Sequence, residues 1–100
     1  GSVFKNVPLS AFPQEYCKRF RIKEKKFTNV IPAGYINDML ELKGMRIGDA
    51  QLSDKHGNYI VNTGHATAEQ VLMLISAIKQ KVRTGCGGLA LHEEIQMVGC

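Results

Sequence analysis

The clearest hydrophobic pattern of the chain lies between Ala68 and Arg83 and predicts an amphipathic helix. Apolar residues recur there at intervals of three to four, which places them on one face of a helix with 3.6 residues per turn. Thr67 precedes this run and Gln70 follows three positions later, so the two side chains can form a capping box at the helix start. The predicted buried stripe consists of Val71, Leu72, Leu74, Ile75, Ile78 and Val82.

A second apolar stripe predicts a helix that starts at Pro32 and ends at Gly44. Proline suits the first turn of a helix because the amide donor that it lacks would have no partner there. Glycine is the usual residue just past a helix end. The stripe consists of Tyr35, Ile36, Met39, Leu40 and Leu42.

The segment between these two helices predicts an antiparallel hairpin. Residues 47–52 and 59–61 are short apolar runs, and the second is rich in β-branched residues. His56, Gly57 and Asn58 lie between the runs and supply the turn.

Both ends of the chain and the segment 9–27 have weaker patterns. Residues 3–4 predict a short strand and residues 89–98 a last strand. Polar and apolar residues alternate over residues 19–23, which is typical of a strand with one buried face. A basic helix that starts at Gln14 remains a second interpretation of this segment.

Taken in order, these elements predict an α+β protein. We expect a two-layer single domain over residues 1–100, in which a small mixed or antiparallel sheet packs against two helices. No apolar run approaches the roughly 20 residues that span a bilayer, and no signal-peptide pattern is visible. A cytoplasmic protein without membrane contact is the expectation.

Composition adds little to this interpretation, since 44% hydrophobic and 22% charged residues are ordinary globular values. Cys17, Cys86 and Cys100 are widely spaced and lack a CxxC pattern, so we expect free thiols and no metal site. Neither a GxGxxG motif nor a Walker loop is present, and no nucleotide cofactor is therefore expected to bind this chain alone.

Charge is more informative than composition, because six of the thirteen basic residues lie within residues 18–26 and the net charge is +4. Phe20 and Phe27 are interleaved with this basic tract, which would supply phosphate contacts and stacking surface. A small nucleic-acid-binding module is therefore an alternative function. The mild overall charge and Glu24 within the tract make nucleic acid an unlikely partner.

Four ordered motifs favour a different function. They are Gly1–Asn6, Pro32–Tyr35, Leu42–Gly48 and Leu91–Gly99. This combination resembles the C-terminal, substrate-binding domain of UDP-N-acetylenolpyruvoylglucosamine reductase, a flavoenzyme of bacterial peptidoglycan synthesis. The resemblance covers residues 1–6 and 31–99.

The resemblance implies two catalytic residues. Ser2 matches the serine that donates a proton to the substrate carbon after hydride transfer. Glu94 matches the second glutamate of the closing motif, which polarises the substrate and stabilises its enol form. In this closing motif His92 and Glu93 replace the usual glutamate and proline, and Gln96 replaces the usual arginine.

Three further residues match substrate contacts of the family. They are Asn6 in the opening motif, Lys43 as a contact for the UDP diphosphate, and His56 at the hairpin turn. The chain departs from the family at Asn37 and Glu41, where an apolar residue and a glycine are usual, and at Val7, where a proline is usual.

In the family, NADPH reduces FAD, and the substrate UDP-N-acetylglucosamine enolpyruvate is reduced to UDP-N-acetylmuramate. FAD is held by domains upstream of the one that this chain resembles. The resemblance therefore implies that the chain works together with upstream FAD-binding domains. By itself, it is expected to have no turnover and to bind neither FAD nor NADPH strongly.

Overall fold

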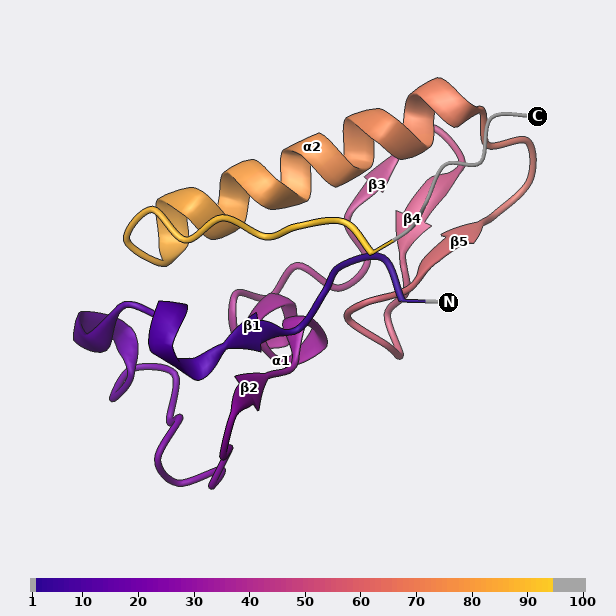
Figure 1. Cartoon of the computed structure of the whole chain (residues 1–100). Coiled ribbons are helices and arrows are strands. Elements are labelled where there is room, and N and C mark those ends of the chain that lie inside the picture. The colour runs from indigo at the N-terminus through magenta and orange to yellow at the C-terminus, as the bar shows by residue number, and fades with distance from the viewer. Residues whose placement is uncertain (1, 95–100) are drawn as a thin grey trace.

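A long helix lies across the larger of two antiparallel sheets, so that the helix and the sheet form two packed layers. The computed structural model describes residues 2–94. Helix α2 (Ala68–Gly85) covers a sheet with strand order β3 (Arg46–Ile47), β4 (Ala50–Leu52) and β5 (Ile60–Asn62) (Figure 1). This arrangement includes the predicted hairpin, in which Leu52 pairs with Ile60.

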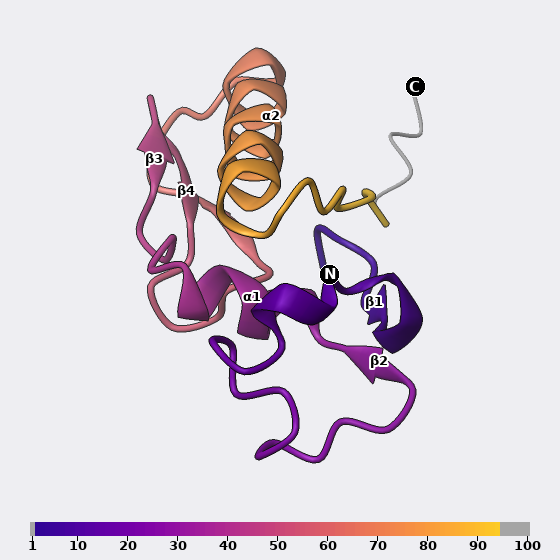
Figure 2. The same cartoon turned by 90° about the vertical axis from the view of Figure 1, so that its left-hand side faces the viewer.

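A second, two-stranded sheet lies on the other side of the short helix α1 (Ala33–Met39) (Figure 2). Strand β1 (Val7–Pro8) pairs antiparallel with β2 (Val30–Ile31). The two sheets and two helices that residues 2–94 form confirm the predicted α+β class. The pairing of β1 with β2 was not predicted, because neither two-residue strand is long enough to show an alternating pattern.

The sequence prediction was most accurate for α2. Thr67 Oγ1 accepts from the amide of Gln70, and Gln70 Oε1 accepts from the amide of Thr67, both at 3.1 Å, so the capping box is confirmed. Four residues of the predicted stripe are buried, namely Leu74, Ile75, Ile78 and Val82. Leu72 is 48% exposed, and its place in the stripe was wrong.

Helix α1 is shorter than the sequence predicted. Pro32 lies just before the helix and not in its first turn, and the helix ends at Met39 instead of continuing to Gly44. The chain leaves the helix at Glu41, which adopts a positive φ of 59°. Gly44 also has a positive φ of 86°, but it belongs to the following turn, where its amide donates to Leu52 O at 2.8 Å.

The strand predicted over residues 19–23 is wrong, although its burial pattern is right. Phe20 and Ile22 are buried and their three neighbours are exposed, as alternation predicts. The backbone forms consecutive turns after a 3-10 helix (Gln14–Tyr16), with Phe20 N bonded to Tyr16 O at 2.9 Å. The basic helix was the nearer interpretation, but Arg21 takes a positive φ of 55° and interrupts it.

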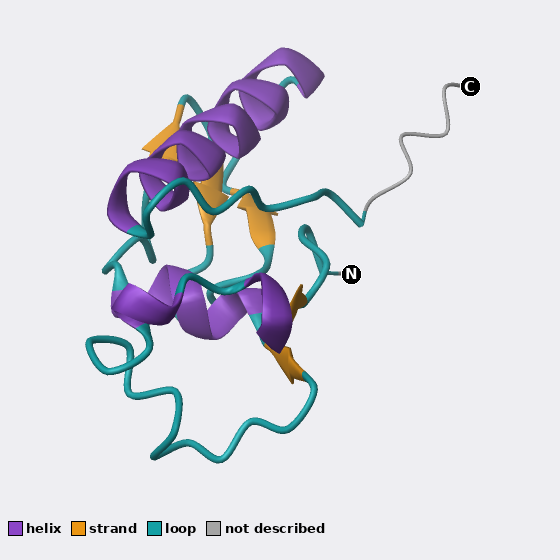
Figure 3. Ribbon diagram, turned by 60° about the vertical axis from the view of Figure 1, so that its left-hand side comes forward, coloured by secondary structure: helices purple, strands orange, loops and turns teal. Residues whose placement is uncertain are grey.

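The long loop between β1 and β2 forms one end of the domain (Figure 3). Phe20 packs edge to face on Phe12, with ring centroids 5.5 Å apart, and Tyr35 Oη donates to Phe20 O at 2.6 Å. These contacts attach the loop to the core because they bury aromatic area and satisfy a loop carbonyl.

The two ends of the described chain lie side by side, as the indigo and yellow segments show in Figure 1. Of the strands predicted at the two ends, the described residues contain a single antiparallel bridge between Phe4 and Glu93. Lys5 N donates to His92 O and Glu94 N donates to Val3 O, both at 2.8 Å. The remainder of the predicted last strand, residues 95–98, lies outside the described residues.

One hydrophobic core joins these elements. Its large, fully buried apolar members come from both ends of the described chain, the two helices and both sheets: Val3, Phe4, Ile31, Ile36, Leu52, Leu74, Ile78, Val82 and Leu91. Within residues 2–94, no helix combines the length and the apolar character needed to cross a bilayer.

Candidate functional site

The segment that carries Ser2 is held from two sides by backbone hydrogen bonds. Val3, the next residue, donates its amide to Asn58 O at 2.9 Å and accepts from the amide of Glu94 at 2.8 Å. Ser2 itself is half-buried. The structure thus brings the backbones of Ser2, the hairpin turn and Glu94 together, although they are far apart in sequence.

The two neighbouring glutamates at the chain end have different surroundings. Glu93 reaches α2, where Lys79 Nζ lies 3.2 Å from both of its carboxylate oxygens. A hydrogen bond from its own backbone amide, the largest single cause, together with a hydrogen bond and the charge of Lys79, holds the pKa of the Glu93 carboxyl below its usual value. Glu94 is exposed and lies beside Val3. Glu93 is therefore paired with Lys79, while the Glu94 side chain is accessible to a ligand.

His56 lies in the hairpin turn two residues before Asn58. Its ring stacks on Tyr59 with centroids 4.1 Å apart and planes 8° from parallel. Ser53 Oγ accepts from the amides of Lys55 and His56, which fixes the start of the turn. Both aromatic side chains are exposed, so the stack presents a flat surface at the end of the hairpin.

Lys43 lies at the same end of strand β4 as this turn, because the next residue, Gly44, bonds to Leu52 O. Its Nζ lies 2.8 Å from Asp38 Oδ1 of α1. The pair is partly exposed, so its net attraction is weak and an anionic ligand could compete for Lys43.

Asn6 lies on the other side of this region, at the start of α1. Its Oδ1 accepts from the amide of Ala33 at 3.4 Å, which supplies the cap that Pro32 cannot provide. Asn6 therefore has a structural contact in addition to the substrate contact expected from the motif.

Two buried asparagines of this region were missed as site residues. Asn58, 5% exposed, bonds to both backbone groups of Phe4, and Asn37 of α1 donates to Gly57 O at 2.7 Å. A turn such as Gly57-Asn58 usually lies at the surface, so no local signal indicated that Asn58 is buried. Asn37 had a signal, since it is a polar residue at a position that is usually apolar in the family.

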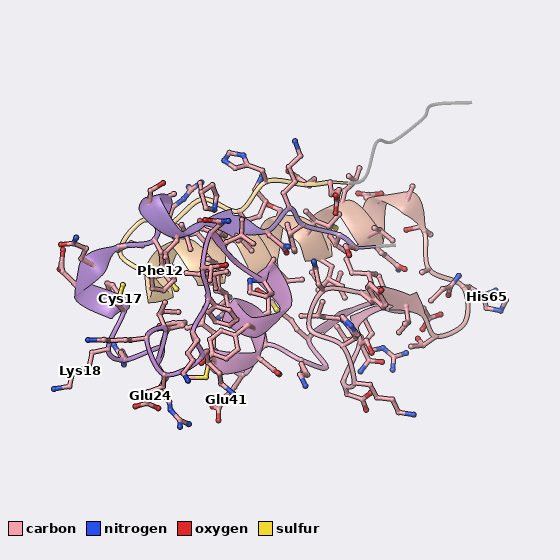
Figure 4. All side chains as sticks on the ribbon, turned by 60° about the horizontal axis from the view of Figure 1, so that its bottom comes forward. Phe12, Cys17, Lys18, Glu24, Glu41 and His65 are labelled. Atoms are coloured by element: carbon pink, nitrogen blue, oxygen red, sulfur yellow. The ribbon has the colours of Figure 1, made fainter. Side chains whose placement is uncertain are left out.

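The basic tract forms a separate feature at the far end of the molecule. A hollow of about 470 Å³ is lined there by Gln14, Cys17, Lys18, Arg21, Lys23 and Glu24. Cys17, Lys18 and Glu24 lie together at this end, opposite His65 (Figure 4). Phe20, which the nucleic-acid hypothesis needed as a stacking surface, is only 3% exposed, so that part of the hypothesis was wrong.

Metal ligands do not converge in the part of the chain that the structure describes. Among residues 2–94, no three side chains of His, Cys, Asp or Glu are placed to hold a common ion.

Comparison with known proteins identifies the domain type. The sequence model of the family "UDP-N-acetylenolpyruvoylglucosamine reductase, C-terminal domain" matches residues 1–98. A reductase of this name from Chloroherpeton thalassium is 40% identical over 99% of the chain and 27% of its own length. UDP-N-acetylenolpyruvoylglucosamine reductase 1 from Bacillus cereus is 44% identical over 73% of the chain and 25% of its own length.

A solved structure agrees with these matches. The crystal structure of UDP-N-acetylenolpyruvylglucosamine reductase from Thermus caldophilus superimposes with a TM-score of 0.59 and 32% identity, covering 96% of this chain and 26% of that one. The chain therefore spans about a quarter of the length of the proteins it matches.

Proposed function

Because the chain belongs to the family of C-terminal domains of UDP-N-acetylenolpyruvoylglucosamine reductase, we propose that it binds the enolpyruvyl UDP-sugar and protonates it during reduction. The observation that carries this proposal is the position of Val3, which is bonded to the amide of Glu94 and to Asn58 O. These bonds support the proposal because they fix the residue that follows the proposed proton donor, Ser2, beside the backbone of Glu94.

We propose the following roles for the residues of this chain. When bound, reduced FAD supplies a hydride to one carbon of the enolpyruvyl double bond, and the other carbon then carries enolate character. Ser2 gives its hydroxyl proton to that second carbon. Glu94 polarises the enolpyruvyl group and stabilises its enol form. The serine alkoxide then regains a proton from solvent.

Lys43, His56 and Asn6 are proposed as substrate contacts. Lys43 would exchange its Asp38 partner for the diphosphate, which carries more negative charge than a single carboxylate. His56 would contact the ligand from the exposed stack on Tyr59. Asn6 has the NH₂ group of its side chain left for a ligand, because Oδ1 is used at the start of α1.

FAD and NADPH are proposed to bind to upstream domains of the complete enzyme, with UDP-N-acetylglucosamine enolpyruvate as the substrate and peptidoglycan synthesis as the setting. In the described part of the chain, the starts of α1 and α2 support this division. The first amide of α1 is bonded to Asn6, and Thr67 and Gln70 cap α2, so neither start is an open phosphate cradle.

The test is Ser2→Ala in the complete enzyme, with the two half-reactions followed separately by flavin absorbance. Reduction of the flavin by NADPH should proceed at the wild-type rate, because Ser2 has no part in it. Product formation should fall by roughly 10²- to 10⁴-fold, the usual contribution of a positioned general acid. Ser2→Cys keeps a proton donor of similar size and should retain more activity than Ser2→Ala. Wild-type turnover in Ser2→Ala would refute the proposal.

A further inference from the structure

The segment of residues 2–6 lacks the support of a regular sheet, and this makes its few hydrogen bonds important. Strand β1 starts only at Val7, and within residues 2–94 the segment pairs with the chain end through the single bridge between Phe4 and Glu93. The position of Ser2 therefore depends on how Val3 and Phe4 are fixed.

Asn58 fixes both residues. Its side-chain Oδ1 accepts from Phe4 N at 2.8 Å, its Nδ2 donates to Phe4 O at 2.9 Å, and its backbone O accepts from Val3 N at 2.9 Å. The side-chain amide thus bonds to Phe4 as the peptide group of a neighbouring strand would. Since Phe4 and Asn58 are buried, no solvent is available to replace these bonds.

Asn58 is in turn held against α1. Asn37 Nδ2 donates to Gly57 O at 2.7 Å, and Asn37 is fully buried. Gly57 lies against the backbone of Gly34, where any side chain at position 57 would collide with Gly34 O. The turn therefore has little freedom to shift, and the same is expected of the segment bonded to it.

We infer that Asn58 is a positioning residue for Ser2, and that Asn37 of α1 holds Asn58 in place. This inference rests on the proposed function, because it needs Ser2 to be the proton donor. Asn58 does not contact the reacting atoms in this arrangement. It sets the distance between the Ser2 hydroxyl and the substrate through Val3 and Phe4.

The experiment compares variants of the complete enzyme at a temperature at which circular dichroism shows each to be folded. Asn58→Ala removes both bonds to Phe4, and Asn58→Asp replaces the donor with an oxygen that faces Phe4 O in a buried site. We expect kcat to fall at least tenfold in both, with KM changed less than threefold. Flavin reduction by NADPH should be unchanged in both.

If Asn58→Ala fails to fold, two further variants still test the role of Asn58. Asn37→Val breaks the bond to Gly57 without touching residues 2–6, and should lower kcat about threefold in the same half-reaction. Val82→Ala is the matched control, since it weakens the core within α2 and changes none of the hydrogen bonds that hold residues 2–6. It should keep kcat within twofold.

The inference is overturned if the folded Asn58 and Asn37 variants have the same kcat as Val82→Ala while Ser2→Ala is inactive. In that case the proton-donor role would stand without the positioning role. If Ser2→Ala turns over like the wild type, the proposed function itself fails, and the two failures are therefore distinguishable.

Discussion

Leu42 donates its backbone amide to Asn37 O at 2.9 Å across the end of α1. Together with the bond from Glu41 N to Asp38 O, also at 2.9 Å, this forms a Schellman motif in which Glu41 takes the left-handed position. Glycine is the usual residue there because a side chain strains the backbone at positive φ. The chain therefore ends α1 with a glutamate in a position that favours glycine.

Replacing this residue with glycine should stabilise the protein. In Glu41→Gly the relief of about 1–2 kcal/mol of left-handed strain exceeds the extra entropy of glycine in the unfolded chain, so a net gain of about 0.5–1 kcal/mol is expected. Urea denaturation measures the change. Glu41→Ala removes the same carboxylate but keeps the strain, and should show no such gain. Equal stabilisation by both variants would point to charge instead of strain.

A second glycine prediction concerns the contact between the β3–β4 turn and α2. Gly48 has a positive φ of 58°, and a Cβ at this position would overlap the Gln70 side chain of the capping box. Gly48→Ala should therefore cost about 2–3 kcal/mol, through strain and a displaced cap. The double variant Gly48→Ala with Gln70→Ala lacks the overlap. In urea denaturation its loss of stability should therefore be smaller than the sum of the losses in the two single variants.

Gly88→Ala is the control for this pair of variants. Gly88 also has a positive φ, of 92°, but nothing lies within 4 Å of the position that a Cβ would take. Its cost should be that of strain alone, about 1–2 kcal/mol. If Gly48→Ala lowered the free energy of unfolding no more than Gly88→Ala does, the overlap with Gln70 would not contribute to the cost.

The sequence was a good guide where one residue pattern had one structural solution. Thr67 and Gln70 lie three apart before a long apolar stripe, and the helix and its capping box followed. It was a poor guide where tertiary contacts decide the backbone. Alternation at Phe20 and Ile22 correctly indicated burial, but turns can bury alternate residues as well as a strand can. The bonds of Asn58 to Phe4 link residues 54 apart, and no local pattern predicts them.

The pKa of Glu93 provides a prediction in which two causes can be separated. Because this pKa is lowered on folding, the associated stability is present above the unfolded value and is lost as pH falls through the folded value. The hydrogen bond from the backbone amide of Glu93 is the largest single cause, and Lys79 adds a side-chain hydrogen bond and a charge interaction. In an NMR titration of the Glu93 carboxyl carbon, Lys79→Met should therefore keep part of the lowering, because the backbone hydrogen bond remains.

Return of the Glu93 pKa to its ordinary value in Lys79→Met would show that the ion pair is the main cause. The effect on stability is expected to be small in either case, since Glu93 and Lys79 are 40% and 30% exposed. Exposed pairs of this kind contribute about 0–1 kcal/mol.

Burial of Cys86 predicts a large difference in reactivity between two thiols. Burial raises the pKa of the Cys86 thiol to about 11, with the positive charge of Arg19 opposing the shift. About one molecule in a thousand would then carry the reactive thiolate at pH 8. Cys17 is half-buried and lines the hollow beside Lys18. In folded protein treated with iodoacetamide at pH 8, peptide mass spectrometry should find Cys17 alkylated well before Cys86. Urea should remove the difference, whereas equal rates in the folded protein would mean that the region around Cys86 opens readily.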